Sequence, residues 1–476
     1  HRGAYRIGLE GLRSEEVVSL ATDALGADPE DAAVAERVWA MSEGQPLFAT
    51  ELLRDVRRGV GVTQLPATVA SLVRTRVDRL PIGVSRLVSA GAALGQEFDL
   101  RVAAAVAELD TDRALDSVDT ALGAELIHEV EGRPDRFRFS HQLVPAAVLD
   151  AMTGARRVRL HGAIVHELEA NDGSLTDIAH HLLEASPLYD LAEVASRVRR
   201  TAAIAIIDQQ YDTAAELLAR LSALSLGQRE HAEVLNELAD AYNRAGRQPQ
   251  ALEPLALSAE AARQNGWSDI LAAAALGRWG QSPYRASRDR SVAPLLDEAL
   301  SHEAGLDPRT TARLLAKRAA FTLFVDPLAD RDRMSARAEQ LVGPEPTPER
   351  LEVLEARWMA IACPATALDL DDIDEEIDEI RKQLGALTTD ACAPEIRLYW
   401  KGEGQTLAGL AADLKDDPRQ RREVDQWRMT ALDGMASLFA GEFDAARLHT
   451  DKALPLGREP WGEAGVVVHG LSLIHI

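Results

Sequence analysis

The sequence predicts a mainly α-helical protein: a small helical region, then a region with one β-ribbon, then a long array of paired helices. Three observations lead to this prediction. Apolar residues make up 46% of the chain but aromatic residues only 4%, and the Ala and Leu that dominate favour closely packed helices. Apolar positions recur at helical spacing along most of the chain. Within the body of the chain, the period changes to strand-like alternation over residues 126–139.

The composition limits the possible functions. With 476 residues the chain has room for about three domains. Its 52 basic and 76 acidic residues give a net charge of −24, which argues against broad binding to nucleic acid or to an anionic membrane surface. We find no long apolar run and no secretion signal, so a cytoplasmic protein without membrane contact is expected. The two cysteines, Cys363 and Cys392, are too few for a disulfide scaffold.

Features at both ends of the sequence indicate that the chain is a fragment. The chain opens with His1 rather than Met, and Ile7 and Leu9 alternate like a last strand, so residues 1–12 are expected to end a preceding nucleotide-binding core. Residues 471–476 resemble a translated transposase adapter and are expected to be non-native. The alternative is a natural apolar tail that was cut by chance.

Residues 13–63 are predicted to form a small helical bundle. Glu15 and Glu16 open one helix, and Pro29 opens another. Gly44 and Pro46 then break the helical pattern, so a sharp corner is expected before the next helix.

Residues 64–156 are predicted to form a winged-helix domain. Helices are expected over about 83–94, 99–107 and 111–123. Alternating apolar residues on both sides of Gly132 predict a two-stranded ribbon. A further helix is expected from about His141. Helices followed by a ribbon and a final helix are typical of this domain.

Residues 157–470 are predicted to form a tetratricopeptide-like (TPR-like) array. Leu235, Leu238, Ala239, Tyr242, Ala251 and Leu255 fall at the spacing of that repeat, with Gly246 in the turn. A related unit surrounds Tyr211, and a third contains Gly434 and Gly441. The segment from Pro344 to Pro348 is expected to be a break between sub-arrays.

The order of these motifs resembles the helical lid and winged-helix region of STAND-class ATPases, and most of all the large ATP-binding regulators of LuxR type and their cyclase-fused relatives. The segments that carry the resemblance are GQPLFATELL at 44–53, LPATV at 65–69, ALGQEF at 93–98 and RFRFSH at 136–141. The resemblance implies a signal-gated switch in which a nucleotide-binding domain, a lid and a winged helix close around ADP.

The resemblance also implies three cofactor-binding residues. Pro46 corresponds to the lid proline that packs near the adenine, with Gly44 permitting the turn. His141 corresponds to the winged-helix histidine that contacts the β-phosphate of ADP. The alternatives are a plain helix corner at Gly44 and Pro46, and a helix-capping pair formed by Ser140 and His141.

No catalytic residue and no metal site are predicted in this chain. The phosphate-binding pattern G-x-x-x-x-G-K-[ST] occurs nowhere in the sequence, so only a longer parent is expected to be a slow ATPase with ATP or ADP and Mg²⁺. The sequence around Lys401 is interpreted as an ordinary loop. His161, His166, His180 and His181 lack metal-ligand spacing and are interpreted as packed or surface residues. The acidic run after Asp369 is interpreted as the solvent face of a helix.

The preferred function is the lid, winged-helix and sensor-array part of a STAND ATPase switch that regulates transcription or another output. Its expected partners are an inducer on the array, either a small molecule or a protein, and further copies of itself. Arg156, Arg157 and Arg159 are expected to pack within the protein rather than on DNA, so no direct nucleic acid contact is predicted. The alternative function is a TPR-type scaffold without nucleotide control.

Overall fold

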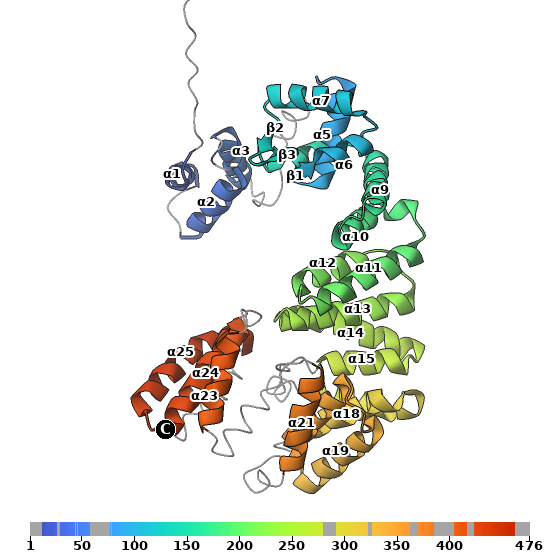
Figure 1. The fold of residues 1–476 in the computed structure, drawn as a ribbon, viewed down its shortest axis with the longest axis vertical. Coiled ribbons are helices and arrows are strands. Elements are labelled where there is room, and N and C mark those ends of the chain that lie inside the picture. The colour runs from blue at the N-terminus through green and yellow to red at the C-terminus, as the bar shows by residue number, and fades with distance from the viewer. Residues whose placement is uncertain are drawn as a thin grey trace, which may run out of the picture. The chain divides into compact units, whose positions relative to one another are not determined.

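In the part of the chain that it describes, the computed structural model is mostly helical, with one small three-stranded sheet (Figure 1). Its contacts divide the chain into two compact units, His1–Val198 and Arg199–Ile476. The structure describes residues 12–25, 29–42, 44, 46–57, 77, 79–278, 292–321, 326–361, 370–384, 404–416 and 423–461. None of the helices in these ranges is long and apolar enough to cross a membrane.

Several predictions concern residues outside the described ranges. They are the strand-like start of the chain, the LPATV segment at 65–69, both cysteines, the loop at 401–403 and the tail at 471–476. The predicted domain limits likewise remain predictions.

The first unit begins with three helices, α1 (Ser14–Leu25), α2 (Pro29–Ser42) and α3 (Pro46–Arg57). The Glu16 carboxylate accepts a hydrogen bond from the Arg13 main-chain N–H at 2.8 Å, which satisfies a donor at the start of α1. The three helices share a small core of Val, Ala and Leu side chains. The predicted helix starts near Glu15 and Pro29 and the corner at Gly44 are confirmed.

The next group contains the sheet. Its elements are α5 (Ile82–Leu94), β1 (Glu97–Asp99), α6 (Leu100–Val106), α7 (Thr111–Gly123), β2 (Ile127–Val130), β3 (Arg133–Phe139) and α8 (Leu143–Asp150). The strands are antiparallel in the order β1-β3-β2. The predicted ribbon is therefore confirmed as β2 and β3. β1 was not predicted from the sequence, because a strand of three residues is too short to show alternation.

Aromatic packing fixes the sheet on the helices. Phe98 of β1 lies 5.4 Å from Phe139 and 6.2 Å from Phe137, measured between ring centroids. All three side chains are buried. A Cβ at Gly91 would lie within 2.9 Å of the Phe98 ring, so α5 can approach β1 only because this residue has no side chain.

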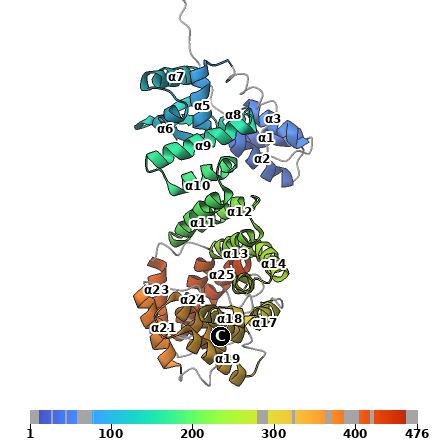
Figure 2. The ribbon, with the colours of Figure 1, turned by 90° about the vertical axis from the view of Figure 1, so that its right-hand side faces the viewer.

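The first unit continues through α9 (Gly154–Ala170), α10 (Leu175–Glu184) and the short η1 (Ser186–Leu188) into α11 (Leu191–Ile207). Helices α9 and α10 pack against each other (Figure 2). The Nδ1 atoms of His161 and His181 lie 2.9 Å apart between these helices, and both side chains are buried. Of the two interpretations given for these histidines, packed or surface residues, packing applies to both.

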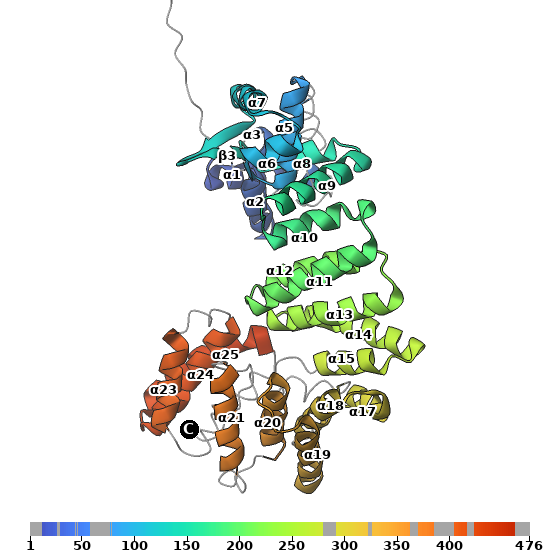
Figure 3. The same ribbon diagram turned by 45° about the vertical axis from the view of Figure 1, so that its right-hand side comes forward.

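The second unit holds antiparallel helix pairs. After the end of α11 it contains α12 (Tyr211–Ser222), α13 (Gln228–Arg244), α14 (Gln248–Asn265) and α15 (Ser268–Arg278), each packed against the next (Figure 3). The turn between α13 and α14 contains Gly246, whose φ is +77°. The helix pair predicted from the repeat spacing is therefore confirmed.

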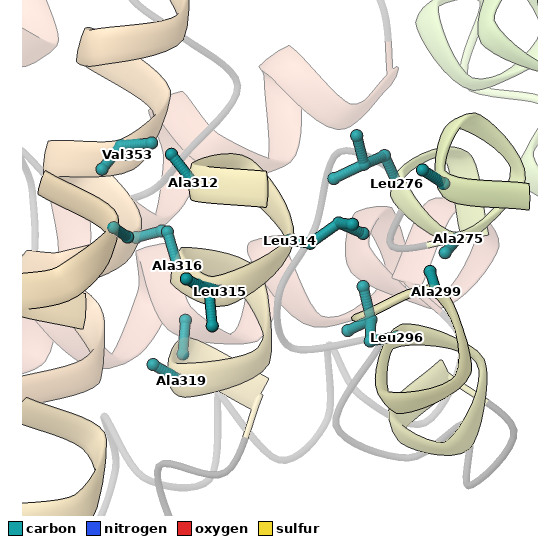
Figure 4. Close-up of a cluster of buried hydrophobic side chains, with 14 of the residues drawn as sticks. Ala275, Leu276, Leu296, Ala299, Ala312, Leu314, Leu315, Ala316, Ala319 and Val353 are labelled. Atoms are coloured by element: carbon teal, nitrogen blue, oxygen red, sulfur yellow. The ribbon is translucent and has the colours of Figure 1, made fainter. Parts of the chain in front are cut away.

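The helices that follow are α17 (Val292–Ser301), η2 (Glu303–Gly305), α18 (Pro308–Phe321), α19 (Leu328–Val342), α20 (Pro348–Ile361) and α21 (Asp371–Leu384). Small and branched apolar side chains interlock between them (Figure 4). This core includes Val342 and Leu351 on the two sides of the proline-rich segment. That segment is therefore a short turn between packed helices and not the predicted break, because Pro348 opens α20.

The interpretation of the acidic run holds for most of its described members, because Asp371, Asp372, Glu375, Asp378 and Glu379 are exposed on α21. Two acids differ: Asp374 is buried, and Glu376 pairs with Arg350 of α20. The last described helices are α23 (Gly404–Asp416), α24 (Glu423–Phe439) and α25 (Phe443–Trp461). Gly434 and Gly441, which marked the third predicted repeat, lie in α24 and in the turn before α25.

Candidate functional site

The predicted site residues lie in two places in the first unit, and the structure brings these places into contact. Gly44 and Pro46 belong to the corner between α2 and α3, and His141 lies just before α8. The His141 Nε2 atom is 2.7 Å from the main-chain oxygen of Ser42, the last residue of α2. His141 therefore contacts the corner at Ser42, which lies two residues before Gly44.

The corner has its shape because Gly44 adopts a left-handed conformation, with φ of +75°. The Gly44 carbonyl accepts a hydrogen bond from the Leu12 main-chain N–H at 2.6 Å. A Cβ at this position would lie 2.1 Å from the Leu12 oxygen, a distance that no side chain tolerates. Trp39 of α2 also donates from its indole N–H to that oxygen, at 3.3 Å. Leu12 is thus fixed against the end of α2.

Pro46 is the first residue of α3 and is exposed. Proline suits this position, because its missing N–H would have no partner in the first turn of a helix. The Thr50 hydroxyl donates to the Pro46 carbonyl at 2.5 Å. The Pro46 ring therefore belongs to a first turn of α3 that this hydrogen bond stabilises.

His141 is positioned by the sheet. The Phe139 main-chain N–H donates to the Gln96 carbonyl at 2.9 Å, and the Ser140 N–H donates to the Leu126 carbonyl at the same distance. These two bonds hold both residues that precede His141. The His141 side chain is 2% exposed, and its Nδ1 atom accepts a hydrogen bond from the Leu143 N–H at 3.1 Å.

The bond at Nδ1 decides where the ring hydrogen lies. An imidazole nitrogen that accepts a hydrogen bond carries no hydrogen, so the neutral ring holds its N–H at Nε2. His141 therefore donates to the Ser42 carbonyl. This carbonyl belongs to the last turn of α2, where main-chain oxygens lack partners within the helix and carry partial negative charge.

Three residues of this region were missed by the sequence analysis. Gln142 donates from its side-chain amide to the Ala40 carbonyl. Ser42 and Ala40 contribute main-chain oxygens, which have no sequence signature. For Gln142 the available signal was its position directly after His141, at the start of a predicted helix.

The polar face of α13 is occupied by contacts with neighbouring helices. Asn236 donates to the Ile270 carbonyl at 3.2 Å, and Asn243 donates to the Gly277 carbonyl at 3.0 Å. Glu237 forms an ion pair with Arg199 at 2.5 Å and raises the pKa of that arginine. These side chains join α13 to α15 and to α11, the helices two places along the chain on either side.

His166 of α9 and His180 of α10 are exposed. Within the described ranges no group of three or more His, Cys, Asp or Glu residues could hold a metal ion.

No known family model matches the chain, and no curated protein matches it. Among solved structures, the chain is similar to a Signal Transduction ATPase with Numerous Domains (STAND) protein with a tetratricopeptide repeat sensor from Pyrococcus horikoshii. The two sequences are 13% identical, and the match covers 98% of this chain and 75% of that chain with a TM-score of 0.33. A TM-score this low assigns neither a fold nor a site to this chain.

Proposed function

We propose that the chain is the lid (13–63), the winged-helix domain (64–156) and the TPR-like sensor array (157–470) of a STAND ATPase of LuxR type. The observation that carries the proposal is the 2.7 Å contact between His141 and Ser42. In the class that the sequence resembles, the lid proline and the winged-helix histidine approach one ADP molecule. A contact between His141 and the corner that holds Pro46 supports the same pairing here.

The residues of the corner fit such a nucleotide. The exposed Pro46 ring offers a rigid apolar face without a donor to an adenine base. His141 has one N–H that can donate to a phosphate oxygen. Because this chain lacks the phosphate-binding loop, ATP hydrolysis and Mg²⁺ binding would belong to a longer parent protein. This chain by itself would not hydrolyse ATP.

The array would receive the inducer. An inducer can shift a switch only by its difference in affinity for the two states, so it must bind the open state more tightly. Exchange of ADP for ATP and assembly of several copies would follow, and then transcription or another output. We place this switch in the cytoplasm.

The alternative function is a scaffold whose array binds a protein or peptide without nucleotide control. The stacking of α12 to α15 favours this alternative, because such helix pairs need no nucleotide to form. The sequence upstream of His1 distinguishes the two functions, since only the switch requires a phosphate-binding loop there.

The test uses a product of the same reading frame that extends upstream of His1. ADP binding is measured by calorimetry for the parent and for His141→Ala. Loss of a hydrogen bond to a charged group costs about 1.5–3 kcal/mol, so ADP should bind about tenfold to a hundredfold more weakly. Inducer-independent output should rise as the resting state loosens.

His128→Ala is the matched control, because His128 is an exposed histidine of β2 in the same unit. This variant should bind ADP like the parent. The proposal is wrong if the extended product binds no ADP. It is also wrong if His141→Ala keeps the affinity and the basal output of the parent.

A further inference from the structure

Two buried histidines face each other between α9 and α10. The Nδ1 atoms of His161 and His181 are 2.9 Å apart, and their ring centroids are 5.1 Å apart. The two side chains are only 3% and 4% exposed. At this distance one Nδ1 atom carries a hydrogen and donates it to the other, which must carry none. We call these two residues the histidine pair, and the proposed nucleotide site uses neither of them.

The folded histidine pair can bind one added proton but not two. The donor ring can be protonated at its Nε2 atom while it keeps the bond between the rings. A second proton would have to bind the acceptor Nδ1, and two N–H groups would then point at each other across 2.9 Å. Two positive charges this close in a buried site also repel each other. In an unfolded chain, by contrast, each imidazole binds its own proton below a pKa of about 6.5.

The charged groups around the histidine pair do not remove this conflict. Helix α9 also packs against α5, α6 and η1. The single charged residue of α5, Arg86, pairs with Glu108. The single charged residue of α6, Arg101, pairs with Asp99, and η1 has no charged residue. The charged or titratable side chains within four residues of the pair on α9 and α10 are Arg157, Arg159, Asp177, His180 and Glu184. The two acids among them can stabilise one positive charge on the pair, but they leave the two N–H groups opposed.

We propose that α9 and α10 form a pH-sensitive joint, whose packing loosens as the pH falls below about 6.5. The folded pair binds one proton fewer than the unfolded pair in acid. Its full stabilisation is therefore present above that pH, and well below it each further pH unit should lower the closing equilibrium constant by about tenfold. Because α9 and α10 link the sheet-containing group to α11, acid would act on the connection that leads to the array. The proposal uses no nucleotide and is independent of the proposed function.

Hydrogen exchange of residues 154–184 in the 476-residue chain tests the joint. The measured quantity is the protection factor, the intrinsic exchange rate divided by the observed rate, which removes the chemical effect of pH. In the unmodified chain it should fall about tenfold between pH 7.5 and pH 5.5. His161→Gln and His181→Gln each leave one imidazole, whose proton the folded and unfolded states both bind, so the fall should disappear. His166→Gln, a change of an exposed histidine on α9, should keep it.

An NMR titration of the histidine rings counts the protons directly. In the unmodified chain, His161 and His181 should together bind one proton between pH 8 and pH 5. Two protons bound by a chain that stays folded would overturn the proposal. A protection factor that is the same at pH 7.5 and pH 5.5 would also overturn it, as would an equal fall in His161→Gln and the unmodified chain. If the glutamine variants do not fold, the proton count in the unmodified chain decides. ADP binding by the extended product tests the proposed function separately.

Discussion

The Ser258 hydroxyl of α14 donates a hydrogen bond to the Ala232 carbonyl of α13, 2.9 Å away. Both residues are buried. A side chain as short as serine reaches another helix only where the two backbones come close. The antiparallel register that places Ser258 beside Ala232 also places Ala251 opposite Ala239, nearer the turn. The exposed fractions of these alanines are 1% and 0%.

Ala239→Leu and Ala251→Leu should each lower the free energy of unfolding. Three extra carbon atoms would force the two helices apart, and overpacking of this kind costs about 1–3 kcal/mol. Urea unfolding followed by circular dichroism measures the change. The matched control is Gln250→Leu, because Gln250 is exposed on the first turn of α14 and should tolerate the change.

Hydrogen exchange extends this test to the neighbouring helices. Because repeats are stabilised by their neighbours, exchange should also quicken in α12 and α15. Alanine variants as stable as the Gln250→Leu protein would contradict the packing of this pair.

The sequence predicted most of the helices because their signals are local. Repeat spacing placed Ala239 and Ala251 correctly, since small residues recur where paired helices meet. It missed β1 because three residues carry no periodicity. It also missed Ser42 and Ala40, whose contribution is a main-chain oxygen that any residue supplies. The burial of Asp374 depends on the packing of α21, which the local pattern of acids does not encode.

Asn243→Ala should destabilise the contact between α13 and α15. The Asn243 side chain is 5% exposed and donates to the Gly277 carbonyl at 3.0 Å. This carbonyl lies in the last turn of α15 that the structure describes, and the Asn243 amide is its side-chain donor. Leaving it unsatisfied should cost about 1–3 kcal/mol, measured as a lower urea midpoint.

Asn265→Ala provides the comparison. Asn265 donates to the Ala261 carbonyl within its own helix and is exposed, so water can replace its bond. Its replacement should change the midpoint much less. If both substitutions lower the urea midpoint equally, the hydrogen bond from Asn243 to Gly277 contributes no more to stability than the exposed bond of Asn265.

The second unit should lose stability in acid as the Glu352 carboxylate becomes protonated. Its carboxylate lies 2.6 Å from the Arg313 Nε atom and 2.5 Å from the Lys317 Nζ atom. Burial raises the pKa of Glu352, but the two cations outweigh burial and lower the pKa to about 2. Because the folded pKa lies below the unfolded value of about 4.3, the stabilisation is complete above that value and is lost as the pH falls toward 2.

Glu352→Gln should therefore remove on the order of 2 kcal/mol at neutral pH and less at low pH. Unfolding midpoints at pH 7, 4 and 3 measure this difference. The control is Glu349→Gln, a change of an acid in the first turn of the same helix. If Glu352→Gln lowers the stability as much at pH 3 as at pH 7, the lowered pKa of Glu352 is contradicted.

Gly44→Ala should disrupt the corner beside the proposed nucleotide site far more than Gly246→Ala disrupts the α13–α14 turn. Both glycines have positive φ, +75° and +77°, so alanine suffers the same backbone strain of about 1 kcal/mol at each. Only at Gly44 would the added Cβ collide with main-chain atoms, 2.1 Å from the Leu12 oxygen. At Gly246 nothing lies within 4 Å. The difference between the two variants therefore isolates the collision.

Because main-chain atoms cannot move aside like the end of a side chain, Leu12 or α2 must shift, and the Leu12–Gly44 hydrogen bond should break. Exchange of the amides at residues 12–17 and 39–44 should quicken in Gly44→Ala, while Gly246→Ala should affect only the ends of α13 and α14. Gly44→Ala should also weaken the contact between His141 and the Ser42 carbonyl, since Ser42 lies two residues away. Equal and small effects of the two variants would mean that Leu12 does not pack on Gly44 in solution.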